Sequence, residues 1–174
     1  LLSDAAADVL AKSGAAIQEH LLDEVAIAHP DPAEAAAACR FGVTSNDQEI
    51  AASDLVIESI VESIEVKRRV LARLEPHLRD EAILATNTST IRLQLLAQAL
   101  RRPERFCGIH FCNPVPQRKL VEIVRGKETN EQTVATVVAY AKSLGKLPIV
   151  VQDAPGFVVN RLLFPHLIEA VELL

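Results

Sequence analysis

Short, almost continuous apolar runs recur along this chain and alternate with longer helical stretches. The runs lie at residues 54–60, 82–87, 106–111, 120–124 and 147–151. Continuous apolar runs of this length are typical of strands buried on both faces, whereas strands with one solvent face alternate polar and apolar residues. Strands separated by helices indicate crossover connections between parallel strands. The pattern therefore predicts an α/β fold, with a mainly parallel sheet and helices on both of its faces.

The helical stretches carry apolar residues three, four or seven positions apart. We expect helices at residues 3–28, 33–38, 62–79, 93–100 and 130–144, and a last helix after Gly156. In the stretch 62–79 the charged residues are expected on the solvent face: Lys67, Arg68 and Arg73. A loop at residues 153–156 predicts the domain boundary. Residues 1–153 are expected to form the first domain, and residues 154–174 the start of a helical second domain.

Composition excludes several classes of function. Net charge is −5, basic residues are dispersed and aromatic residues make up 3%, so we expect no nucleic-acid partner. No apolar run is long enough to span a membrane, and no membrane partner is expected. Cys39, Cys107 and Cys112 lack metal-ligand spacing, which predicts reduced core thiols and no metal site. We expect a cytoplasmic enzyme, with the mitochondrial matrix as the alternative, and a piece of a longer protein because methionine is absent.

Polar side chains follow three predicted strands where each strand ends. Glu62 and Lys67 follow the first, Ser89 follows the second, and His110 and Asn113 lie at the end of the third. Ligands bind at the carboxyl ends of strands in an open parallel sheet, so we expect one polar site there. Each residue also has a structural interpretation that the sequence leaves open: a helix N-terminal carboxylate, a solvated lysine, a helix cap or a satisfied core histidine.

Glu122 favours a catalytic interpretation of His110. It is the only acidic residue in an apolar strand that follows His110 after one short turn. A carboxylate there can bind one ring nitrogen and leave the other free as a general base, and buried charges seldom lack a partner. We predict a Glu122 oxygen within about 3.2 Å of a His110 ring nitrogen. Asn160, four residues after Gly156, either points into the same cleft or caps the last helix.

Five segments with these polar residues occur in a fixed order. They are DLVIESIVE (54–62, followed by Lys67), NTST (87–90), GIHFCNPVP (108–116), LVEIV (120–124) and PGFVVNR (155–161). Together they resemble the 3-hydroxyacyl-CoA dehydrogenase family over nearly the whole chain. The resemblance implies a Rossmann-like domain that binds NAD, followed by the first helix of an α-helical C-terminal domain. It also implies a homodimer in the intact parent protein.

The resemblance further implies that NAD oxidises an L-3-hydroxyacyl-CoA at C3 to the 3-ketoacyl-CoA. His110 is then the base that takes the hydroxyl proton, and Glu122 orients and polarises it. Ser89 and Asn160 are expected to be catalytic as well, because they hold the substrate oxygen. The residues expected to line the cofactor are Ile60, Glu62, Lys67, Ser89 and Asn113.

The chain departs from the family where the pyrophosphate of NAD binds. No two of its six glycines are close enough to form a Gly-x-Gly-x-x-Gly turn. We therefore expect that the first strands of the NAD-binding unit are missing and that this piece alone does not turn over substrate. Cys112 stands where the family usually has a second phenylalanine. The family's CoA-contacting positions fall near His20 and Ala28.

Two other classes of function fit the sequence less well. A β-hydroxyacid dehydrogenase carries the proton on a lysine spaced from an asparagine of the last helix, but three apolar residues precede Asn160 here. A non-enzymatic relative, such as a lens crystallin, is expected to lose a catalytic residue, whereas all four catalytic positions are present. Both alternatives are therefore disfavoured.

Overall fold

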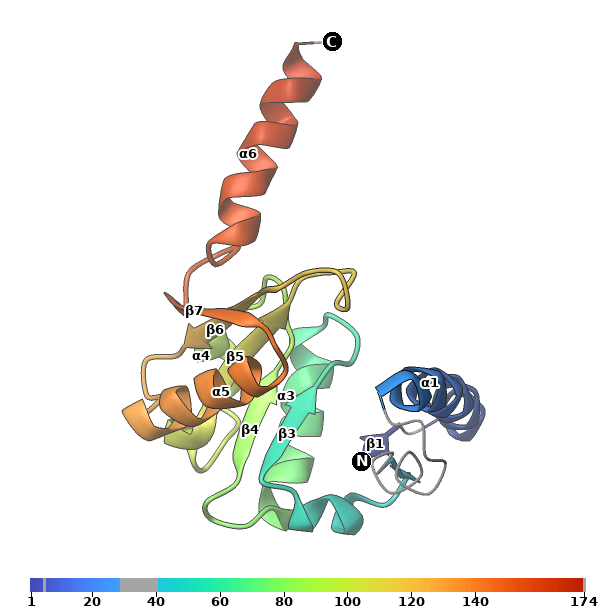
Figure 1. The fold of residues 1–174 in the computed structure, drawn as a ribbon. Coiled ribbons are helices and arrows are strands. Elements are labelled where there is room, and N and C mark those ends of the chain that lie inside the picture. Colours follow the sequence, from blue (N-terminus) through green and yellow to red (C-terminus); the bar gives the residue numbers. More distant parts are fainter. Residues whose placement is uncertain (5, 29–40, 174) are drawn as a thin grey trace. The chain divides into compact units, whose positions relative to one another are not determined.

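The computed structural model describes residues 1–4, 6–28 and 41–173, which divide into two compact units (Figure 1). The first unit is Leu1–Ala52 and the second is Ser53–Leu174. The helix expected at residues 33–38 lies outside the described residues. The domain boundary expected at residues 153–154 falls within the second unit and stays a prediction.

The first unit begins with a short strand where the sequence predicted helix. Its elements are β1 (Leu2–Ser3), α1 (Ala7–Ala28), β2 (Val43–Thr44) and the 3₁₀ helix η1 (Asp47–Ala52). Ser3 pairs in parallel with Thr44, and Asp4 Oδ1 accepts a hydrogen bond from the Ala6 backbone N–H at 2.8 Å. This local turn competes with helix at the chain's start, so α1 begins four residues later than expected.

The second unit contains all five strands that the apolar runs predicted. Its elements are β3 (Leu55–Glu58), α3 (Ile64–Leu74), η2 (Glu75–His77), β4 (Ile83–Thr86), α4 (Leu93–Ala97), η3 (Pro103–Arg105), β5 (Phe106–Phe111), β6 (Leu120–Arg125), α5 (Glu131–Ser143), β7 (Leu147–Gln152) and α6 (Val159–Glu172). The sheet order is β3-β4-β5-β6-β7. All neighbouring strands are parallel except β5 and β6, which confirms a mainly parallel sheet.

The direction of β6 follows from the length of the connection before it. Only residues 112–119 join β5 to β6, and a crossover between parallel strands needs a dozen or more residues. The two strands must therefore run antiparallel, and residues at their facing positions lie directly opposite each other. This reversal sets the geometry of the site described below.

Helices cover both faces of this sheet. In Figure 1, α5 and α3 lie on opposite sides of the strands. The face under α5 is a buried apolar cluster that includes Cys107, Ile109 and Ile123 from the sheet and Val137 from the helix. On the other side, Leu71 of α3 and Leu93 and Leu96 of α4 are buried. Each such side chain contributes about 1.5–3 kcal/mol of hydrophobic stabilisation, so the sheet is stabilised from both faces.

The last helix differs from the others because its side chains are largely exposed. None of the residues of α6 is buried, and its apolar residues Leu162, Phe164 and Ile168 are each more than half exposed. Figure 1 shows α6 extending away from the sheet of its unit. Within the described part of the chain, no helix has both the length and the apolar character needed to cross a membrane.

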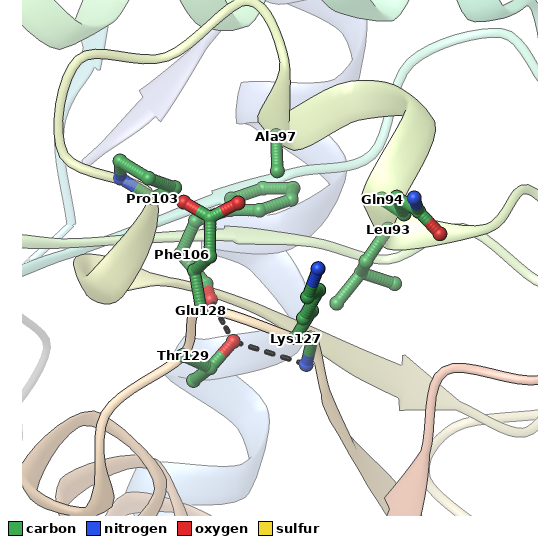
Figure 2. Close-up of a pocket in the computed structure, with 9 residues that line it drawn as sticks. Leu93, Gln94, Ala97, Pro103, Phe106, Lys127, Glu128 and Thr129 are labelled. Carbon is green, nitrogen blue, oxygen red and sulfur yellow. Dashed lines mark hydrogen bonds between the residues drawn. The ribbon is translucent and has the colours of Figure 1, made fainter.

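A small cavity lies between α4 and the start of β5 (Figure 2). Leu93, Phe106 and Thr129 are among the side chains that line it. Thr129 Oγ1 donates to the Phe106 carbonyl at 2.6 Å and accepts from the Gly126 N–H at 3.0 Å. The cavity has a volume of only about 10 Å³, roughly the room one water needs. It is a packing feature and no candidate for substrate binding.

Candidate active site

His110 and Glu122 face each other across the antiparallel pair of strands. They are register partners on β5 and β6, and His110 Nδ1 lies 2.7 Å from Glu122 Oε2. The predicted contact is confirmed. Because a carboxylate only accepts hydrogen bonds, Nδ1 carries the ring proton and donates, and the lone pair of the neutral imidazole is then on Nε2. The arrangement leaves Nε2 as the basic nitrogen.

The second carboxylate oxygen of Glu122 binds the start of α6. Glu122 Oε1 accepts from the backbone N–H groups of Val158 at 2.8 Å and Val159 at 3.0 Å. Glu122 itself is fully buried. Backbone amides at a helix N-terminus are favourable hydrogen-bond donors to a carboxylate. Glu122 therefore contacts both His110 and the start of α6; the sequence predicted the first contact but not the second.

Phe157 packs against the histidine ring. The ring centroids of Phe157 and His110 lie 5.7 Å apart at an interplanar angle of 58°, a tilted aromatic contact. Phe157 has a φ of 50°, which is uncommon outside glycine, and follows Gly156 with a φ of 72°. The strained turn carries a buried aromatic ring onto the imidazole. Sequence reasoning missed this residue, although Pro155 and Gly156 marked the turn.

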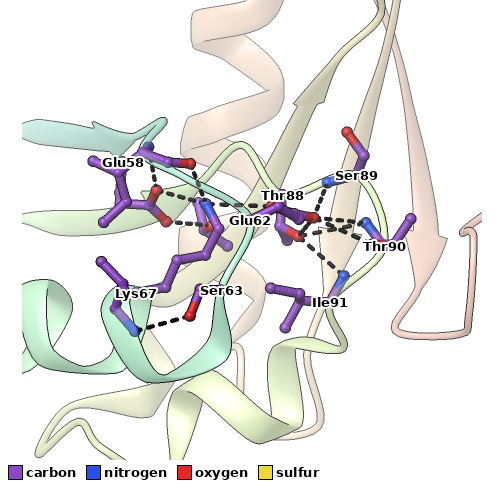
Figure 3. Close-up of polar contacts among 11 residues, drawn as sticks. Glu58, Glu62, Ser63, Lys67, Thr88, Ser89, Thr90 and Ile91 are labelled. Atoms are coloured by element: carbon purple, nitrogen blue, oxygen red, sulfur yellow. Dashed lines mark hydrogen bonds and ion pairs between the residues drawn. The ribbon is translucent and has the colours of Figure 1, made fainter.

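Glu62 accepts hydrogen bonds from the loop after β4 (Figure 3). Its Oε1 accepts from Thr88 Oγ1 and from the backbone N–H groups of Ser89 at 3.0 Å and Thr90 at 3.2 Å. Burial raises the pKa of Glu62, but the hydrogen bonds from residues 88–90 and the charge of Lys67 outweigh it, so the pKa lies below its ordinary value. The two polar strand ends, at Glu62 and at Ser89, are thus brought together as expected.

Lys67 faces the interior, so its placement on the solvent face of the helix was wrong. Its side chain is only 1% exposed, and Nζ lies 2.7 Å from Glu58 Oε1 and 3.1 Å from the Ile60 carbonyl. Nζ also lies 3.5 Å from Glu62 Oε2. Glu58 is buried at the end of β3, and a buried carboxylate needs a cation close by. A helical pattern alone did not reveal this partner. Figure 3 shows Lys67 beside Glu58.

Neither Ser89 nor Asn160, the two cap candidates in the sequence, is the N-cap residue of α4 or α6. Asp153 accepts from the backbone N–H groups of Leu93 at 2.8 Å and Gln94 at 2.9 Å, and so stabilises the start of α4. The N-cap residue of α6 is Val158. Asn160 instead donates from Nδ2 to the Ser89 carbonyl at 3.2 Å. The capping interpretation of Asn160 is therefore not supported.

The start of α6 contacts both the His110–Glu122 pair and the loop after β4. Val158 binds Glu122, the partner of His110, and Asn160 binds Ser89. The structure thus brings four of the predicted residues to one edge of the sheet. Asn113 is exposed in the turn after β5, and Ile60 is exposed after β3. Neither has a described contact with His110 or Glu122.

Known proteins resemble this chain in sequence and in fold. Residues 1–154 match the family model described as "3-hydroxyacyl-CoA dehydrogenase, NAD binding domain". The chain is 58% identical over 113 residues to a protein of Pseudomonas paraeruginosa named "Fatty acid oxidation complex subunit alpha". That match covers 65% of this chain and 16% of the relative, so the chain corresponds to a small part of it.

Solved structures share the fold over almost the whole chain. A 3-hydroxybutyryl-CoA dehydrogenase from Escherichia coli superposes with a TM-score of 0.88 at 34% identity, covering 97% of this chain and 36% of that protein. The (S)-3-hydroxybutyryl-CoA dehydrogenase PaaH1 from Ralstonia eutropha gives a TM-score of 0.87 at 36% identity, covering 97% and 60%. Both relatives extend well beyond the matched region.

Proposed function

Because this chain belongs to the 3-hydroxyacyl-CoA dehydrogenase family, we propose that it carries the acid–base centre of an NAD-dependent oxidation of L-3-hydroxyacyl-CoA to 3-ketoacyl-CoA. The observation that carries the proposal is the buried pair formed by His110 and Glu122, with the proton on Nδ1 and the lone pair on Nε2. The name of the Pseudomonas relative supports a role in fatty-acid metabolism.

The proton step uses the basic nitrogen of His110. Nε2 takes the proton of the substrate's 3-hydroxyl group, and the imidazolium that forms is stabilised by the Glu122 carboxylate on the opposite side of the ring. The other oxygen of Glu122 accepts hydrogen bonds from two backbone amides, which hold the carboxylate in place. When bound, NAD supplies the acceptor for the hydride that leaves C3. General-base catalysis of this kind contributes about 10² to 10⁴ in rate.

Ser89 and Asn160 are proposed to hold the substrate oxygen. Both are uncharged, so they stabilise developing negative charge without competing for the proton. The hydrogen bond from Asn160 to the Ser89 backbone leaves the Ser89 hydroxyl available, and both residues are partly exposed. Their mutual contact supports a shared role in one cleft.

The nicotinamide side of NAD fits the residues around Glu62. Ile60, Glu62 and Asn113 are exposed, and Ser89 is partly so, which suits residues that touch a cofactor. Lys67 is buried in its ion pair, so its proposed contribution is to hold the loop after β3 in place. No glycine motif for the pyrophosphate occurs in this sequence, and none of these residues is assigned to that group.

Substrate and assembly of the complete protein are part of the same proposal. The acyl-CoA substrate follows from family membership, and the exposed apolar side of α6 suits packing in a helical C-terminal domain that also forms a homodimer. Residues 154–174 are proposed as the start of that domain. We retain a cytoplasmic location, with the mitochondrial matrix as the alternative.

The complete protein that contains this chain provides the test. It should reduce NAD with L-3-hydroxybutyryl-CoA and leave both the D isomer and free 3-hydroxybutyrate unused. His110→Ala should lower turnover by at least about 10², the lower range for losing a general base. His77→Ala, which removes an exposed histidine, is the matched control and should be silent. Equal turnover of the free acid, or an active His110→Ala enzyme, would overturn the proposal.

A further inference from the structure

A thiol lies beside the catalytic pair and has no part in the proposed reaction. Ligand atoms of His110, Cys112 and Glu122 all lie within 4.8 Å of one another. His110 and Glu122 are buried, whereas Cys112 is partly exposed. Nitrogen, sulfur and carboxylate oxygen are the ligand types that Zn²⁺ binds in proteins. The cluster therefore combines a complete three-ligand set with a side that is open to solvent.

The cluster combines a residue of β5, the residue just after β5 and a residue of β6, which is why spacing along the sequence did not reveal it. Cys112 lies one residue beyond the end of β5, and its Sγ stays close to His110 and Glu122. Cys107, by contrast, points to the apolar core. Register then brings Glu122 opposite His110. Two ligands from the end of β5 and one from β6 thus lie close together.

We propose that His110, Cys112 and Glu122 bind a thiophilic divalent cation, with Zn²⁺ as the best match, and that the bound cation switches off the base. Tetrahedral zinc sites have ligand distances of about 2.0–2.3 Å, which puts the ligand atoms roughly 3–4 Å apart. The atoms of this cluster need shifts on the order of an ångström to reach that geometry. A water molecule completes the coordination, as in sites with three protein ligands.

Binding moves two protons. Zn²⁺ bonds to Nδ1 of His110, and the ring proton transfers to Nε2. Cys112 binds as thiolate and releases its proton to solvent, so one proton is released in total. Burial and the charge of Glu122 raise the pKa of the Cys112 thiol, and the cation must displace that proton. With Nε2 protonated, His110 has no lone pair for the substrate hydroxyl, so bound Zn²⁺ inhibits.

The binding test uses Co²⁺ as a coloured substitute for Zn²⁺ in the complete protein. Wild-type protein should show the thiolate-to-cobalt charge-transfer absorption, and added Zn²⁺ should abolish it. Cys112→Ser should lose the absorption and weaken Zn²⁺ binding by at least about tenfold, the lower range for disturbing a metal's surroundings. Cys112→Phe tests the same loss with the residue that is usual in the family. Cys107→Ala is the matched control and should keep the absorption.

The inhibition test rests on the proposed function, so its result is interpreted separately from the cobalt spectrum. Zn²⁺ should inhibit wild-type turnover, and Cys112→Ser and Cys112→Phe should need at least about tenfold more Zn²⁺ for half-inhibition. An absorption that persists in Cys112→Ser would refute the site. Absorption that depends on Cys112 without inhibition would refute the switch. If the metal-free enzyme is inactive, the proposed function fails, while the cobalt spectrum still decides whether the site exists.

Discussion

Replacing Glu122 by glutamine tests how a single buried carboxylate controls the proton of His110. The change keeps the size of the side chain but turns one carboxylate oxygen into an NH₂ donor. Oε1 accepts two backbone hydrogen bonds, from Val158 and Val159, so the amide oxygen must stay there. The NH₂ group then faces His110 Nδ1, which can only accept from it. The ring proton therefore moves to Nε2, and the base loses its lone pair.

The magnitude follows from this change of tautomer. A comparable Asp-to-Asn replacement in the serine-protease triad lowers turnover about 10⁴-fold because it traps the wrong tautomer, and a similar loss is expected for Glu122→Gln. Stability should change far less. The two amide hydrogen bonds change from charge-assisted, about 1.5–3 kcal/mol each, to neutral, about 0.5–1.5 kcal/mol. The free energy of unfolding should thus fall by about 2–3 kcal/mol.

The assay combines turnover at saturating L-3-hydroxybutyryl-CoA with urea unfolding and with nitrogen-15 NMR of the histidine ring. The NMR spectrum should show the His110 proton on Nδ1 in the wild type and on Nε2 in Glu122→Gln. Glu128→Gln makes the same chemical change on an exposed loop carboxylate and should leave all three measurements unchanged. If Glu122→Gln kept turnover within about tenfold of wild type, the tautomer argument would be refuted.

Three further predictions concern the residues around this pair. Asn160→Ala should lower turnover by about 10² to 10³, the scale of losing one oxyanion donor, with little change in melting temperature. Arg161→Ala, at the exposed next position, is the control. If Asn160→Ala destabilised the protein while the molecules that stay folded kept full turnover, Asn160 would have a structural role. Lys67→Met should destabilise the protein by about 3–5 kcal/mol because it leaves Glu58 buried and unpaired. The double variant Lys67→Met/Glu58→Gln should recover part of that loss in urea unfolding, and no recovery would contradict the pairing. The pKa of Glu62 is lower in the folded protein than its ordinary 4.5, so its contribution to stability is present above that value and is lost as the pH falls through the folded pKa. Glu62→Gln should therefore be less stable than wild type at neutral pH, and the gap should close below about pH 4.5; a gap that is independent of pH would contradict this.

The sequence determined most of the elements and their order. Apolar runs identified all five strands of the second unit, because strands buried on both faces must be apolar along their length. It also singled out His110 and Glu122, since an acidic residue is costly in such a strand unless it has a partner. The confirmed distance of 2.7 Å between them shows that this reasoning extends to a specific contact. Catalytic roles for these residues remain proposals.

Periodicity misplaced residues whose neighbours are distant in the sequence. Lys67 lies on a helix with a polar pattern, yet the buried carboxylate of Glu58 draws it inward. Ser3 pairs with Thr44 in a strand instead of starting the helix. A pattern measures local preference, while pairing between distant segments is decided by which charges and backbone groups are otherwise left without partners.

The tertiary structure decided the register and the surroundings of the His110–Glu122 pair, whose contact the sequence predicted. The short connection of residues 112–119 reverses β6, and only this reversal puts Glu122 opposite His110. The left-handed conformation of Phe157 then turns the chain so that its ring covers the imidazole. Backbone amides at the start of α6 donate the remaining hydrogen bonds to Glu122. These contacts depend on strand direction and on one turn's dihedral angles, which hydrophobic periodicity does not encode, because it records which residues are buried and not which residues they meet.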